Sequence, residues 1–132
     1  MTLPPAIVVH SLRHIRAALA AASAAGGPVL LLSARGAALH GGAGWWRAMI
    51  AAAQPPPGCP DALDCADNPA RAIEALGLGC GLVVLMPQVP AWADIAQRAA
   101  ARGATLLPTR PPALDLACPD APRCLYGWLS QA

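Results

Sequence analysis

The fold class is decided by one stretch, Asp67 to Pro87, which reads D-N-P-A-R-A-I-E-A-L-G-L-G-C-G-L-V-V-L-M-P. Asp67 or Asn68 can cap a helix that has Pro69 at its first position and runs to about Leu76. The glycines of 77–81 end that helix, and the apolar run 82–86 follows. A continuously apolar run is typical of a parallel strand that is covered on both faces, so the stretch predicts a helix followed by a buried parallel strand.

The same alternation extends toward the N-terminus. Residues 6–9 form a short apolar run rich in β-branched side chains, which predicts a first strand. Ser11 offers an N-cap for a helix over 12–25, and Gly26 and Gly27 end it. A second strand is expected at 29–32. Beyond a glycine-rich loop, the pattern predicts a helix over 43–53 and a weaker strand over 61–65.

Toward the C-terminus, a helix is expected from Pro90 to Arg102, then a strand over 105–107, a short edge strand over 114–117 and a helical turn near 125–129. Such β-α alternation predicts an α/β fold, a flavodoxin-like or Rossmann-like open parallel sheet of four to five strands with helices on both faces. We expect residues 1–132 to form a single domain. The proline-rich tail 108–132 is expected to pack on the core, or to swap onto the core of another copy.

The segment Asp67–Pro87 also resembles a β-α-β unit of the phosphate-binding barrels, including the bacterial keto-acid-phosphate aldolases. The resemblance covers about a sixth of the chain. It implies a parallel sheet and leaves open an alternative architecture, a half-barrel that dimerises. Aldolase chemistry of that kind needs a lysine, and this chain has none.

The basic residues are informative, because all nine are arginine. Enzymes that form a Schiff base on lysine, enzymes that use pyridoxal phosphate and P-loop nucleotidases are therefore excluded. We expect no cofactor. The net charge is only +2 and the arginines are scattered along the chain, which argues against nucleic-acid binding.

Neither a membrane span nor an export signal is expected. Residues 17–34 carry no charge, but Gly26, Gly27 and Pro28 divide the run into pieces too short to cross a bilayer. The first ten residues lack the basic region of a secretory signal. Five cysteines cannot all pair within one chain, so we expect reduced thiols and a cytoplasmic location.

A ligand site is expected in the loop from Ser33 to Gly44, S-A-R-G-A-A-L-H-G-G-A-G, which is longer than most loops between a strand and a helix. Its glycines allow close backbone approach, and Arg35 can clamp an anion such as a carboxylate or phosphate. The open alternative is a flexible surface loop. The candidate ligand-binding residues at these strand ends are Ser11, Ser33, Arg35, Gly41, Gly42, Gly44, Trp45 and Asp67.

A second interpretation is enzymatic, with His10, His40 and Asp64 as acid–base candidates in a small lyase or hydrolase. Clustering of these three side chains would favour it. Strand alternation turns Cys65 away from the face of Asp64, so we expect a buried thiol there. No metal site is expected.

Three functions therefore remain open: a small-ligand or regulatory module that binds an anion, the lyase or hydrolase, and a homo-oligomeric assembly module without catalysis. The anion-binding module is favoured, because the glycine-rich loop is present and no complete catalytic set is. Only 12% of the residues are charged, which favours a homodimer with Trp46, Trp92 or Trp128 as anchors.

Overall fold

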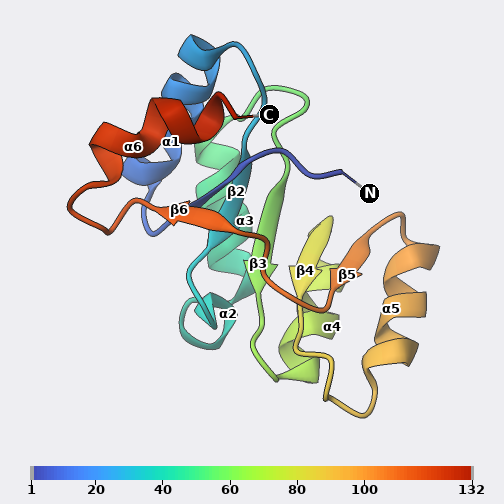
Figure 1. Ribbon diagram of the computed structural model, residues 1–132. Helices are drawn as coiled ribbons and strands as arrows, with labels where there is room; N and C mark the ends of the chain where they lie inside the picture. Colours follow the sequence, from blue (N-terminus) through green and yellow to red (C-terminus); the bar gives the residue numbers. More distant parts are fainter. Residues whose placement is uncertain (1, 132) are drawn as a thin grey trace.

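The computed structural model describes residues 2–131, which form one parallel sheet and the helices that pack on it (Figure 1). The strands are β1 (Ala6–Val9), β2 (Leu30–Ser33), β3 (Asp61–Asp64), β4 (Leu82–Val84), β5 (Thr105–Leu107) and β6 (Ala113–Asp115). The helices are α1 (Leu12–Ala25), α2 (Ala37–His40), α3 (Gly42–Ala53), α4 (Pro69–Gly77), α5 (Trp92–Ala101) and α6 (Ala121–Leu129).

The sheet has the strand order β5-β4-β3-β2-β1-β6, and each neighbouring pair is parallel. The prediction of an α/β fold with an open parallel sheet is therefore confirmed. Within residues 2–131 the sheet has six strands rather than four or five, because the tail contributes β6. Its register sets Ala113 beside Ala6 at the start of β1.

The helices share one face of the sheet, and the expectation of helices on both faces was wrong. The larger hydrophobic cluster combines strand residues with residues of α1, α3, α4, α5 and α6. The cluster on the opposite face contains no helical residue; its buried members are Ala6, Val8, Leu30, Leu32, Ala62, Leu82 and Val84. From β1 to β5 each crossover moves one strand in the same direction, and right-handed crossovers then place their helices on the same side.

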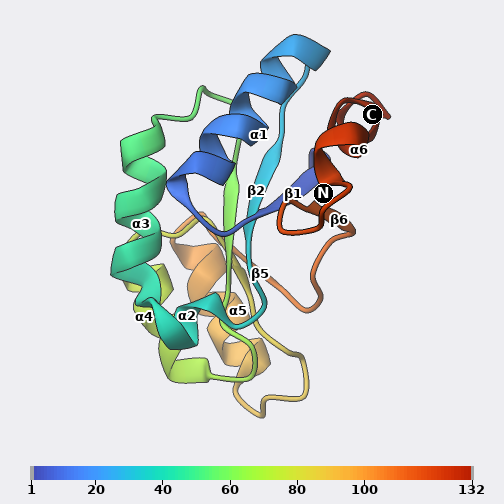
Figure 2. The same cartoon turned by 90° about the vertical axis from the view of Figure 1, so that its left-hand side faces the viewer.

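The sheet is curved, and chain length explains why. Five inter-strand spacings of about 4.8 Å separate β5 from β6 in a flat sheet, or roughly 24 Å. The strap, residues 108–112, joins Leu107 to Ala113 in six steps that reach at most about 22 Å. The edges must therefore approach each other. In Figure 1 the strap passes in front of the strands as it runs from β5 to β6, and Figure 2 shows α1, α3 and α4 on the opposite side of the sheet from the strap.

Local signals fix two of the helices. The Ser11 side chain accepts a hydrogen bond from the His14 backbone N–H and caps α1, and Gly26 ends that helix in the left-handed conformation with φ 79°. Asn68 caps α4 in the same way through the Arg71 N–H, ahead of Pro69. These are the boundaries that the sequence predicts.

Other expectations need correction. The loop over 33–44 contains the four-residue helix α2, and the expected final turn is the nine-residue helix α6. Trp46 is fully buried in the core, where its Nε1 donates to Asp61 at 2.9 Å, so it cannot anchor a dimer. Among residues 2–131, no helix combines the length and apolar character needed to span a bilayer.

Candidate functional site

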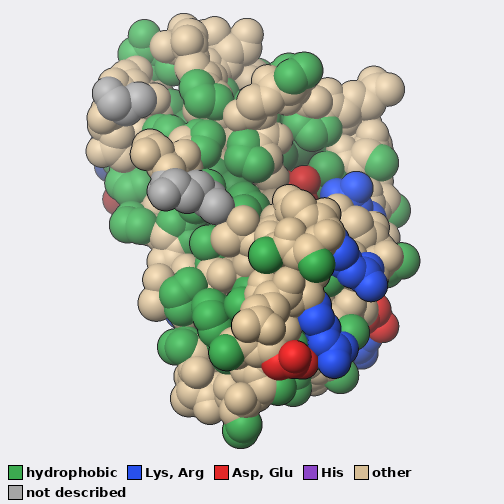
Figure 3. All heavy atoms as spheres, turned by 90° about the vertical axis from the view of Figure 1, so that its right-hand side faces the viewer, with side chains coloured by type: hydrophobic (Ala, Val, Ile, Leu, Met, Phe, Trp, Pro, Cys, Tyr) green, Lys and Arg blue, Asp and Glu red, His purple; other side chains and the backbone are tan. Residues whose placement is uncertain are grey.

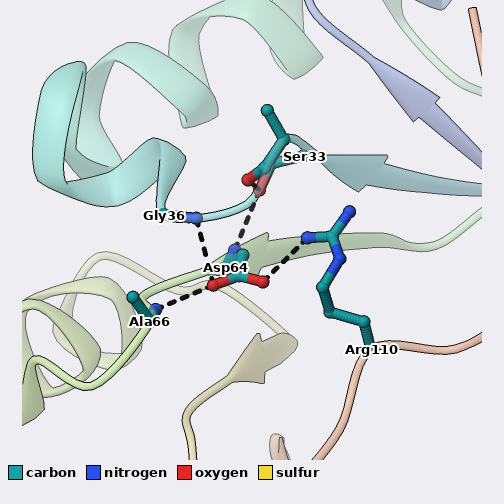
Figure 4. A network of polar contacts seen from close by, with 6 residues as sticks. Ser33, Gly36, Asp64, Ala66 and Arg110 are labelled. Atoms are coloured by element: carbon teal, nitrogen blue, oxygen red, sulfur yellow. Dashed lines mark hydrogen bonds and ion pairs between the residues drawn. The ribbon is translucent and has the colours of Figure 1, made fainter.

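The carboxyl end of β3 carries a buried acidic network (Figure 4). Asp64 is only 4% exposed, and its Oδ1 accepts hydrogen bonds from the backbone N–H groups of Gly36 and Ala66 at 3.2 and 2.7 Å. Its Oδ2 accepts from Nη1 of Arg110 at 2.7 Å. These three donors replace the hydrogen bonds to water that the Asp64 carboxylate loses on burial. Asp64 therefore holds the β2–α2 turn, the start of the β3–α4 loop and the strap together.

Ser33 also has a structural role. Its Oγ accepts a hydrogen bond from the Asp64 backbone N–H at 2.9 Å and donates one to the Ala34 carbonyl at 3.0 Å. The side chain is fully buried, so it has no free surface for a ligand. Ser11 is occupied as the cap of α1, whereas Asp67 is exposed in the turn before α4.

Arg35 is a cation that faces solvent at this edge. Its side chain is exposed, and within residues 2–131 it makes no hydrogen bond or ion pair. It lines three adjoining hollows. The first, about 300 Å³, is lined by Arg35, Asp64, Val84, Met86, Pro108, Thr109 and Arg110. The second, about 380 Å³, is lined by Val8, Arg35, Arg110, Pro111, Pro112, Ala113 and Asp115.

The third hollow, the histidine cavity, has a volume of about 220 Å³ and is lined by Val9, His10, Ala34, Arg35, Ala37, His40, Gly41 and Trp45. It brings together five of the side chains or backbone positions that the sequence singled out: His10, Arg35, His40, Gly41 and Trp45. Trp45 is 40% exposed and lies directly over Gly41, where a side-chain Cβ would come within 2.5 Å of its ring. Gly41 is therefore needed for this wall of the cavity.

The other glycines of the loop have separate roles. Gly36 and Gly42 adopt left-handed conformations, with φ 64° and 78°, that other residues rarely take. Gly44 lies inside α3, and nothing approaches the place where its Cβ would be.

His10 is paired with a carboxylate, but not with the one expected. Its Nε2 lies 2.7 Å from Oδ1 of Asp115 on β6, and its backbone N–H donates to Nδ1 of His14. Burial lowers the pKa of His14, and the nearby His10 and Arg13 lower it further. Burial alone would raise the pKa of Asp115, but hydrogen bonds from the Ala117 N–H and from His10 lower it below its ordinary value.

The three acid–base candidates are thus divided. His10 and His40 line the same cavity, whereas Asp64 is held by Arg110 and by backbone donors. Cys65 lies on the convex side and is fully buried; burial, together with the Asp64 carboxylate, raises its pKa to about 12. In the part of the chain that the structure describes, no three His, Cys, Asp or Glu side chains are grouped to hold a metal ion.

Neither Arg110 nor Asp115 was selected as a ligand-binding or catalytic candidate, although Arg110 follows the predicted strand over 105–107. Both lie in the tail, and each meets its partner because β6 returns to the sheet beside β1. The sequence offered one signal for Asp115: it is an acidic residue at the carboxyl end of a short apolar run, where parallel strands carry their functional side chains. The sequence does not show which strand lies beside it.

A larger hollow lies at the opposite edge of the sheet, where β3, β4 and β5 begin. It measures about 670 Å³ and is lined mainly by prolines, glycines and leucines, with Asp61 as its charged residue. Asp61 already pairs with Trp46 and Arg47. Ligands of parallel α/β sheets bind at the carboxyl ends of the strands, and only that edge combines an unpaired cation with imidazoles here.

Fold and site together define an α/β protein with a curved parallel sheet and a cationic edge centred on Arg35. No protein-family model matches this sequence, and no curated protein matches it.

Proposed function

We propose that the protein binds a small organic anion, a carboxylate or a phosphate ester, through Arg35 at the carboxyl edge of the sheet. One observation carries the proposal: an exposed guanidinium without a partner in residues 2–131 lines three adjoining hollows. A guanidinium binds a carboxylate or phosphate through two parallel hydrogen bonds. The hollows provide room for the rest of the ligand.

The charges at this edge support a ligand with few negative charges. Arg110 lines two of the same hollows, but the buried Asp64 carboxylate compensates its charge. Asp115 is engaged by His10. Among these residues, Arg35 is thus the one whose charge has no partner. The hollows have volumes of 220–380 Å³, which fit a small metabolite better than a polymer.

Binding is tested by calorimetry and thermal shift with inorganic phosphate, phosphate monoesters, phosphate diesters and small carboxylates. A ligand at 100 times its Kd raises the stability by about 2.7 kcal/mol. Arg35→Gln should abolish the shift. Arg16→Gln is the matched control, because Arg16 is an exposed arginine on α1, away from the strand ends. Equal binding by both variants would contradict the proposal.

We further propose a homodimer in a reducing compartment, the cytoplasm, because charge is sparse and five cysteines cannot all pair. Figure 3 shows hydrophobic side chains spread over one side of the molecule, with most of the charged side chains in its right-hand half. The proline-lined hollow at the amino edge is the surface that a second copy would cover. Sedimentation equilibrium tests this: Pro57→Glu should weaken association, and a monomer at all concentrations would contradict it.

A further inference from the structure

We propose that the histidine cavity hydrolyses phosphodiesters, with His10 as general base, His40 as general acid and Arg35 as the anion-binding group. The proposal rests on the proposed function, because it needs Arg35 to hold the phosphoryl group. It adds a reaction and a substrate class. The observation behind it is that two imidazoles and an unpaired guanidinium line one cavity of about 220 Å³.

His10 has the surroundings of an oriented base. Asp115 lies 2.7 Å from its Nε2, and Asp115 is itself fixed by the Ala117 N–H at 2.8 Å. A carboxylate on one ring nitrogen keeps the proton there and leaves the other nitrogen with its lone pair. His14 packs edge-on against the ring of His10, with centroids 5.6 Å apart, and limits its rotation. Asp115 is thus a positioning residue, and His10 is the group that meets the substrate.

The charge of the cavity selects the diester among phosphate compounds. A phosphodiester carries one negative charge near neutral pH, and Arg35 supplies one uncompensated positive charge. A monoester carries nearly two charges; Arg35 balances one of them, and the protonated His40 would have to balance the other, which would leave its proton unavailable for the leaving group. A neutral carboxylic ester would not use the guanidinium in its ground state.

The second imidazole explains how an alkoxide could leave. His10 takes a proton from a water molecule as its oxygen attacks phosphorus. The bond from phosphorus to the leaving oxygen then breaks, and His40 donates its proton to that oxygen. The products are an alcohol and a phosphate monoester, and proton exchange with solvent restores both histidines. Arg35 stabilises the charge that builds on the phosphoryl oxygens.

The first experiment measures release of p-nitrophenolate from bis(p-nitrophenyl) phosphate. Loss of a general base lowers such rates by about 10²- to 10⁴-fold, so His10→Gln should lose that much in kcat. Asp115→Asn should lower kcat and leave KM unchanged, because Asp115 acts through His10 and does not line the histidine cavity where the diester reacts. Asp115→Glu should recover part of the loss. Arg16→Gln is the control and should match the unaltered protein.

The second experiment separates the two histidines by leaving group. Nitrophenolate departs without a proton, whereas the alkoxide of an alkyl diester needs one. His40→Gln should therefore retain most activity on bis(p-nitrophenyl) phosphate and lose it on a thymidine dinucleotide and on glycerophosphocholine. Cleavage of the dinucleotide or of the glycerol diester identifies which source of phosphodiesters the protein uses.

Binding of dimethyl phosphate, measured by calorimetry, distinguishes the two proposals. Binding that depends on Arg35 without turnover of any diester would overturn the hydrolase proposal and leave the anion site standing. Absence of both would overturn the two together. Turnover that survives His10→Gln would show a contaminating enzyme and also overturn the proposal.

Discussion

Arg110 and Asp64 are 46 residues apart in the sequence, yet Nη1 of the guanidinium donates a hydrogen bond of 2.7 Å to Oδ2 of the carboxylate. The pair fastens the strap to the end of β3, and both side chains are largely shielded from water, at 13% and 6% exposure. This ion pair holds the strap against the carboxyl end of β3, close to Arg35, which lines the same hollow.

Removal of one member of this pair should be costly. Arg110→Met leaves the Asp64 carboxylate buried with only its backbone donors, and we expect the free energy of unfolding to fall by about 2 to 4 kcal/mol. Urea denaturation measures this. Arg123→Met is the control, because it removes an exposed ion pair with Asp120 and should cost less than about 0.5 kcal/mol. Equal losses in the two variants would show that burial does not matter here.

Gly41 and Gly44 are only three residues apart, yet they should respond in opposite ways to substitution by alanine. At Gly41 the new Cβ would meet the Trp45 ring at 2.5 Å, so we expect a loss of about 1 to 3 kcal/mol. At Gly44, inside α3, the space is open and alanine should gain about 0.5 to 1 kcal/mol. Thermal denaturation compares them. Gly41→Ala combined with Trp45→Ala should recover stability, and no recovery would refute the steric explanation.

The five thiols should differ sharply in reactivity. Cys65 and Cys80 are buried, and burial raises their pKa values to about 12 and about 11, so little thiolate forms at pH 8. Cys118 and Cys124 are exposed. Iodoacetamide labelling followed by mass spectrometry should modify these two first, and Cys65 and Cys80 only after denaturation. Rapid labelling of Cys65 in the native protein would contradict its burial and its raised pKa.

Acid should destabilise the protein in two stages. The pKa of His14 in the folded state lies below its ordinary value of 6.5, so the unfolded chain binds that proton more readily and stability falls as the pH drops below about 6.5. The lowered pKa of Asp115 adds stability above its ordinary 3.8, and this contribution disappears as the pH falls through the folded-state value. Melting temperatures from pH 8 to 3 measure both stages.

Variants assign these two stages to their residues. His14→Gln should flatten the upper one and Asp115→Asn the lower one. The charged or titratable neighbours are His10, Arg13 and Asp115 around His14, and His10 and His14 around Asp115. An unchanged pH profile in both variants would place the acid sensitivity elsewhere.

Local sequence signals predicted most of the secondary structure. Ser11, Gly26 and Asn68 act through contacts within a few residues, so α1 and α4 begin and end where expected. The placement of the helices did not follow from such signals, because it depends on the direction in which successive strands are added. That direction is a property of the whole sheet, and the pattern of apolar residues is the same for either arrangement.

The sequence predicted the part of the candidate site that comes from one continuous stretch of chain. Arg35, His40, Gly41 and Trp45 belong to one stretch of chain, and they line one cavity with His10. The partner of His10 is 105 residues away, and no periodicity connects the two. Ser33 was selected because it ends a strand, but its hydroxyl is used to hold the next strand.

The position of β6 beside β1 also has a consequence for synthesis on the ribosome. β1 is made before the five strands that follow it, and its neighbour β6 is the last of these to be made, so that edge of β1 stays open until residues 113–115 have been translated. An unpaired strand edge is prone to association with other chains. Nascent chains should therefore depend on chaperones until residues 113–115 leave the exit tunnel, and His10 gains its carboxylate only at that moment.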